Sequence, residues 1–175
     1  MIFLYLFNTG VPILLLALLG SFFHVLIHEA GHAAPVLLGS RGWATIYIGS
    51  YGDSRRSFGC RIGRLKIRIK YNPFLWSKGM CQPGGASFSI NQQILYVAAG
   101  PLGSLLLGAV SCGLLSAGGI PGFLRLWLGF VVLFSAMGLL GSIVPAGRRH
   151  HTRDGRPVYP DLILIIRLWR SKRLA

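Results

Sequence analysis

The stretch Phe22–Ser40 reads FFHVLIHEAGHAAPVLLGS and places two histidines and a glutamate inside a run of apolar residues. Its central pentapeptide, HEAGH, follows the pattern HExxH. Because residues four apart share one face of a helix, His28 and His32 can bind a single zinc ion through their imidazole nitrogens. Glu29 lies beside them and can exchange a proton with metal-bound water. A lone carboxylate is costly to bury in hydrocarbon, and this cost favours a metal site over two merely packed histidines.

The chain around this motif has the composition of a membrane protein. Of its 175 residues, 53% are hydrophobic and 13% are charged, whereas about a quarter of the residues in a soluble domain are charged. Three apolar segments, 11–38, 94–115 and 123–144, exceed the roughly 20 helical residues that cross a bilayer. The sequence therefore predicts a mainly α, polytopic membrane protein in which residues 1–175 form one core with three transmembrane helices.

Residues 41–91, between the first two apolar segments, differ in character. Residues 64–71 read RLKIRIKY, and this alternation of basic and apolar side chains is typical of a strand with one wet and one buried face. The segment WATIYI at 43–48 is rich in β-branched and aromatic residues, which strands favour. CQPGGASF at 81–88 reads as a turn followed by a third extended piece. We expect a small β-region at the membrane surface rather than a solvated basic loop.

The positive charges indicate how the chain crosses the membrane. Residues 41–91 hold nine of the eighteen Lys and Arg residues, and the tail from Arg148 holds eight. The positive-inside rule then predicts an outside N-terminus, with the 41–91 loop and the basic tail 146–175 in the cytoplasm. The net charge of +14 indicates contact with anionic lipids on the cytoplasmic side of the membrane. Nucleic acid is not an expected partner. The compact core suggests a bacterial cell membrane.

A catalytic zinc site, with one ion per chain, needs three protein ligands and an open position for water. Beyond the two histidines of HEAGH, the candidates for the third ligand are Asp154, Asp161, His150 and His151. Asp154 follows the cytoplasmic end of the third apolar segment and precedes Gly155, which allows a tight turn. A carboxylate is also a suitable zinc ligand. These features favour Asp154, and the two adjacent histidines remain alternatives.

Four features in order resemble the site-2 protease family of intramembrane zinc metalloproteases, in a compact form without a PDZ domain. They are HEAGH at 28–32, the glycine-rich loop ending in PGG at 83–85, AAGPLGS at 98–104, and the stretch from Pro145 to Asp154-Gly155. The resemblance implies a three-helix catalytic core in which His28, His32 and Asp154 bind zinc and Glu29 is the catalytic acid/base. Ser142 stands where the family commonly has an asparagine, and the stretch from Pro145 to Asp154 is longer than usual.

The resemblance implies an endopeptidase that cleaves a transmembrane or membrane-anchored protein or peptide precursor in or near its membrane segment. Such a substrate must unfold locally, and a strand edge within residues 81–90 can hold it extended. The candidate substrate-binding residues are Ser142, Gly84, Gly85 and Ser87.

Other functions remain open alternatives. A catalytically inactive membrane scaffold or substrate-binding relative is the first of them. A metal transporter would need ionisable groups in several spans, and a lipid-modifying zinc hydrolase has no specific feature in this sequence. An accessory membrane partner or a homo-oligomer is compatible with either of the leading alternatives.

Overall fold

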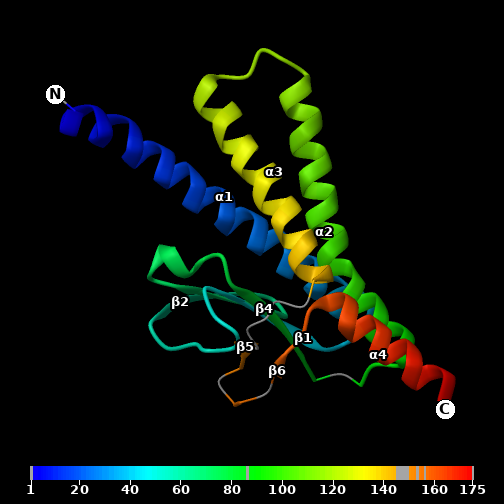
Figure 1. Ribbon diagram of the computed structural model, residues 1–175. Coiled ribbons are helices and arrows are strands. Elements are labelled where there is room, and N and C mark those ends of the chain that lie inside the picture. Colours follow the sequence, from blue (N-terminus) through cyan, green and yellow to red (C-terminus); the bar gives the residue numbers. More distant parts are fainter. Residues whose placement is uncertain (1, 86, 145–149, 153, 156, 175) are drawn as a thin grey trace.

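The computed structural model describes residues 2–85, 87–144, 150–152, 154–155 and 157–174, without the side chains of residues 2–8 and 150 (Figure 1). The α-helices in this part of the chain are α1 (Ile2–Gly39), α2 (Ile90–Ser116), α3 (Gly122–Ile143) and α4 (Asp161–Leu174). By length and composition, three of them can cross a membrane: Thr9–Gly39, Ile90–Ser116 and Gly122–Ile143. The mainly helical fold with three long apolar helices is therefore confirmed.

The three long helices pack against one another at positions where side chains are small or absent. A Cβ at Gly31 of α1 would lie 3.0 Å from the carbonyl carbon of Ala99 and would overlap its oxygen. A Cβ at Gly103 of α2 would lie 3.1 Å from the carbonyl oxygen of Ile27. Small residues allow such close backbone approach between apolar helices. The glycines bring the HEAGH turn of α1 directly against the first half of α2.

Helix α2 begins at a well-defined cap. The hydroxyl of Ser89 accepts a hydrogen bond from the backbone N–H of Gln92, and the Gln92 side chain accepts one from the backbone N–H of Ser89. This reciprocal capping box satisfies two backbone donors that the first helical turn leaves free. It fixes where α2 starts, and thereby the height along α1 at which the side chains of α2 meet the histidines.

A four-stranded sheet lies between α1 and α2 in the chain and packs on the lower half of α1 (Figure 1). Its order is β2-β3-β1-β4, with β1 parallel to β3 and antiparallel to β4. Ala44, Ile46 and Ile48 alternate along β1 and are fully buried against α1, which is the period expected of a half-buried strand. The strands are β1 (Trp43–Ile48), β2 (Ser57–Ile62), β3 (Leu65–Lys70) and β4 (Gly79–Gly84). A short 3-10 helix, η1 (Pro73–Leu75), connects β3 to β4.

The strands predicted at 43–48 and 64–71 are present as β1 and β3. At 81–88 a turn followed by an extended piece was predicted; in the structure β4 runs to Gly84, through the predicted turn, and residues 87–88 belong to no strand. Strand β2 was not predicted. Beyond α3, two short strands, β5 (His150–His151) and β6 (Pro157–Val158), pair as a hairpin that leads to α4.

Candidate metal centre

Three potential metal ligands meet where α1 approaches the start of α4. His28 and His32 lie one turn apart on α1, and Asp161 is the first residue of α4. The Nε2 atoms of the two histidines are 3.3 Å apart. An oxygen of Asp161 lies 3.5 Å from His28 Nε2, and its other oxygen lies 3.7 Å from His32 Nε2. The ligand atoms therefore converge on one point from two separate helices.

The hydrogen bonds on the far side of each imidazole decide which atoms face that point. Nδ1 of His32 donates to the backbone carbonyl of Tyr96, at 2.8 Å, so it carries the proton and Nε2 presents a lone pair. Nδ1 of His28 lies 2.8 Å from the hydroxyl of Ser104, a residue that is fully buried. Such outer partners fix the orientation and tautomer of metal-binding histidines. The lone pair on His32 Nε2 then faces His28 Nε2 and the Asp161 carboxylate, an arrangement that can hold a cation.

The separations fit zinc. Four ligands at about 2.0–2.1 Å in tetrahedral geometry lie about 3.4 Å from one another. The nitrogen–nitrogen separation of 3.3 Å and the nitrogen–oxygen separations of 3.5 and 3.7 Å come close to that value. Two imidazoles and one carboxylate are also a ligand set found in catalytic zinc sites, which leave the fourth position for water.

The carboxylate in this group is Asp161, not the predicted Asp154. Asp154 is exposed in the turn between β5 and β6, where Gly155 has φ +76° and donates its backbone N–H to Thr152. The glycine that made Asp154 attractive as a ligand thus serves the hairpin turn. His151 is exposed in β5, and the side chain of His150 lies outside the described residues.

Ser142 near the end of α3 holds Asp161 in place. Its hydroxyl donates to the carboxylate of Asp161 at 2.9 Å, and the serine is 7% exposed. Ser142 is a predicted substrate-binding residue. In the structure its hydroxyl hydrogen is donated to the Asp161 carboxylate, which it can orient.

Glu29 lies on the neighbouring face of α1 and is buried against strand β4. The backbone N–H of Cys81 donates to its carboxylate. A Cβ at Gly79 would lie 2.6 Å from Glu29 Oε1, so only glycine leaves room for the carboxylate there. Burial raises the pKa of the Cys81 thiol to about 12, and Cys81 does not belong to the ligand group.

The predicted clamp at 81–90 is partly occupied by the chain itself. β4 is an edge strand, but at Cys81 the N–H is bound by Glu29 and the carbonyl accepts from the Tyr96 hydroxyl at 2.6 Å. Pro83 lacks an N–H. A substrate strand that adds here must displace both bonds at Cys81.

The other predicted substrate-binding residues lie near the end of the same strand. The indole of Trp43 covers both Gly84 and Gly85. A Cβ at Gly84 would lie 2.6 Å from a ring atom, and one at Gly85 would lie within 2.9 Å of several ring atoms. Gly85 has φ +70°, a conformation that side chains disfavour. Ser87 is exposed. These residues form the turn from β4 to α2 and do not contact the histidines.

One further buried histidine lies deeper in the bundle. His24, one turn before His28, is 7% exposed, and its ring packs against the backbone of Gly138 on α3. Its Nδ1 and the hydroxyl of Ser135 are the buried side-chain polar atoms without a hydrogen-bond partner in the described part of the protein. His24 does not belong to the ligand group.

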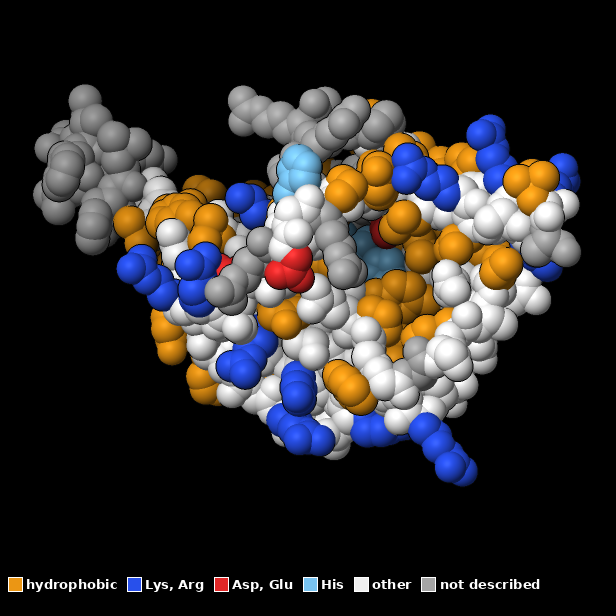
Figure 2. All heavy atoms as spheres, turned by 90° about the horizontal axis from the view of Figure 1, so that it is seen from below, with side chains coloured by type: hydrophobic (Ala, Val, Ile, Leu, Met, Phe, Trp, Pro, Cys, Tyr) orange, Lys and Arg blue, Asp and Glu red, His pale blue; other side chains and the backbone are white. Residues whose placement is uncertain are grey.

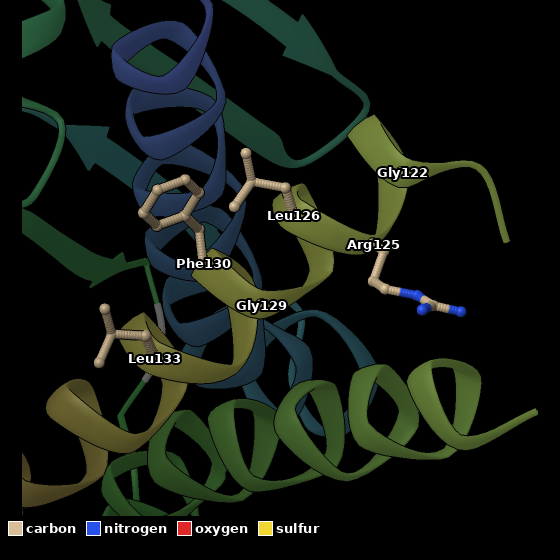
Figure 3. Close-up of a pocket in the computed structure, with 6 residues that line it drawn as sticks. All are labelled: Gly122, Arg125, Leu126, Gly129, Phe130 and Leu133. Carbon is tan, nitrogen blue, oxygen red and sulfur yellow. The ribbon is translucent and has the colours of Figure 1, made fainter. Parts of the chain in front are cut away.

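The hollow at the histidine centre is distinct from another depression, which lies along α3. Viewed from below, histidine side-chain atoms lie inside a hollow that hydrophobic side chains border in part, and Lys and Arg side chains are spread over the same face (Figure 2). The second depression, about 450 Å³, lies along α3 (Figure 3). Its lining includes Arg125, Leu126, Phe130 and Leu133 but no metal ligand. Of these two depressions, only the histidine centre brings potential metal ligands together.

Comparisons with known proteins leave the chain without a named relative. No family model, curated protein or solved structure matches it.

Proposed function

We propose that this protein is a zinc-dependent endopeptidase of the membrane, which cleaves a peptide bond in or near the membrane segment of an anchored protein or peptide precursor. The observation that carries the proposal is the convergence of His28, His32 and Asp161 beside a buried glutamate. The ordered resemblance of the sequence to site-2 proteases supports the same reading. The three long apolar helices support a place in the membrane.

His28, His32 and Asp161 would hold the zinc ion, with their orientation set by Ser104, the Tyr96 carbonyl and Ser142. A zinc ion bound there lowers the pKa of a coordinated water and polarises a carbonyl oxygen. Glu29 follows His28 directly in the sequence and is shielded from bulk water, so it can accept a proton and return it to a departing amine.

The surrounding chain restricts what reaches this glutamate. β4 passes directly over Glu29 through Gly79 and Cys81, so a peptide must approach beside β4 or replace its contacts at Cys81. An extended backbone suits that edge, since edge strands recognise peptides by main-chain pairing. A helical membrane segment would therefore have to unwind before cleavage. This requirement directs cleavage to segments with weak helix-forming residues.

The test combines metal content with cleavage. Purified wild type is expected to hold about one zinc ion per chain, as a catalytic site requires, and Asp161→Ala to lose most of it, while the matched variant Asp154→Ala retains it. Liposomes containing mixed transmembrane peptides with a Gly- or Asn-rich centre then report cleavage by mass spectrometry. Glu29→Gln should keep zinc and abolish cleavage. Zinc binding without Glu29-dependent cleavage of any peptide would instead support the inactive scaffold.

A further inference from the structure

Helix α4 carries an apolar stripe that the described part of the protein does not cover. Leu162, Ile166 and Trp169 are 38%, 42% and 48% exposed; Leu162 also lines the space between α4 and the bundle, so the outward-facing part of the stripe is Ile166 and Trp169. The spacing of the three residues, four and then three positions apart, places them on one side of the helix. The helix contacts α2 and α3, and its half-buried apolar side chains are Ile163, Leu164, Ile165 and Leu168. α4 thus has one apolar side toward the bundle and a second one facing outward.

The charges of α4 are segregated along its length. Asp161 at the first position is its only acidic residue, Arg167 lies near the middle, and the cations Arg170, Lys172 and Arg173 lie in the second half. The guanidinium of Arg173 lies 3.4 Å from the centre of the Trp169 ring, so a cation borders the exposed stripe. An apolar stripe flanked by Lys and Arg is typical of a helix that lies in the interface of an anionic membrane.

The contact between α4 and the helical bundle leaves a gap. An open groove of about 310 Å³ lies beside this contact, and its lining is apolar except for Ser142. The polar link across this junction is the hydrogen bond from Ser142 to Asp161. Protein packing therefore holds the first turns of α4 incompletely. The lining includes Leu102, Leu105, Leu139, Leu162 and Ile165.

We propose that α4 binds an anionic lipid surface, through its exposed stripe and basic end, and that this binding holds Asp161 at the His28–His32 pair. The inference rests on the metal centre of the proposed function. Because one rigid helix carries both the lipid-binding surface and the third ligand, lipid binding and zinc binding must strengthen each other. Each cation near an anionic surface strengthens membrane binding by about five-fold, so the three in the last turns of α4 supply enough to bias its position.

The test measures zinc affinity by chelator competition in nanodiscs of phosphatidylcholine, with and without phosphatidylglycerol. Wild type is expected to bind zinc at least about five-fold more tightly with the anionic lipid, the lower end of typical couplings between sites. The triple variant Arg170→Gln/Lys172→Gln/Arg173→Gln should lose this difference. The matched variant Arg41→Gln/Arg56→Gln/Arg61→Gln removes the same charge from exposed residues near the sheet and should keep it.

The variants separate this effect from zinc accumulation at a charged membrane, which would raise the apparent affinity of all three proteins equally. An equal rise in all three, or none in wild type, overturns the proposal. Hydrogen exchange of the α4 amides provides a readout without metal, with slower exchange expected in the anionic nanodiscs. If no zinc binds in either membrane, the proposed peptidase fails. Equal exchange in both membranes would then also overturn the lipid-held helix, and slower exchange would uphold it.

Discussion

Replacing Gly100 by alanine should remove metal binding while leaving the helices in place. A Cβ there would lie 2.7 Å from Cδ2 of His32 and would overlap Nε2 and Cε1, whereas ordinary contact begins at 3.4 Å. The imidazole must therefore shift by at least about 0.7 Å, although metal–ligand distances tolerate only about 0.2 Å. We expect zinc affinity to fall more than about 100-fold, beyond the range seen when only a ligand's hydrogen-bond partner is lost.

Two further glycines of α2 provide controls for this prediction. Gly103→Ala also narrows the α1–α2 contact, at 3.1 Å from the Ile27 carbonyl, but touches no histidine. Gly113→Ala meets nothing within 4 Å and should gain about 1 kcal/mol of helix stability. Chelator competition gives zinc affinity, and circular dichroism checks the helical content. If Gly100→Ala binds zinc as tightly as wild type, or no more weakly than Gly103→Ala, the placement of His32 at the metal is refuted.

Three other predictions follow from side chains in and around the centre. Ser142→Ala removes the hydroxyl that orients Asp161 and should weaken zinc binding about 10- to 100-fold; unchanged affinity in the same chelator assay would contradict this role. Bonds to Arg55 and Lys70 hold the pKa of Asp53 well below its usual value, so its stabilising effect is complete above about pH 4 and is lost as the pH falls further. Asp53→Asn should therefore cost about 1–3 kcal/mol in chemical denaturation at pH 7, and the difference from wild type should shrink in strong acid. His24→Leu removes an unpartnered buried nitrogen, so the thermal midpoint should hold or rise with zinc retained; loss of zinc would instead place His24 in the centre.

Much of the fold could be predicted because its signals are local. Long apolar runs located the three helices, and the β-branched segment at 43–48 matches β1 residue for residue. Strand β2 escaped because SFGCRI is exposed along most of its length and has no apolar alternation. Strand β2 is fixed by its pairing with β3, where Gly59 leaves room for the Arg68 side chain. This pairing is a tertiary contact, so a local sequence pattern does not reveal it.

The residues of the candidate metal centre likewise divide into those that local sequence signals predict and those that depend on tertiary packing. His28, Glu29 and His32 lie within one pentapeptide, so helical geometry alone predicted that the two imidazoles share one face of the helix. The third ligand depends on how α4 docks, which no local pattern encodes. A usable signal was present: Asp161 follows a proline and opens an amphipathic segment, and an acidic residue is favoured in the first turn of a helix. Ser104, the Tyr96 carbonyl and Ser142 became visible only through the packing of three helices.

The construction of the site indicates which part of it metal removal would disturb first. The two histidines are fixed from outside by Ser104 and the Tyr96 carbonyl, on a helix contact where glycines leave no space for rearrangement. Asp161 is instead linked to the bundle by one serine beside an apolar groove. Without a cation, Asp161 keeps only the hydrogen bond from Ser142 and its contacts with the two imidazoles, whereas each histidine keeps its partner on the far side of the ring. Asp161 is therefore the least constrained of the three candidate ligands, and removal of a bound metal should displace the start of α4 while α1 and α2 stay together.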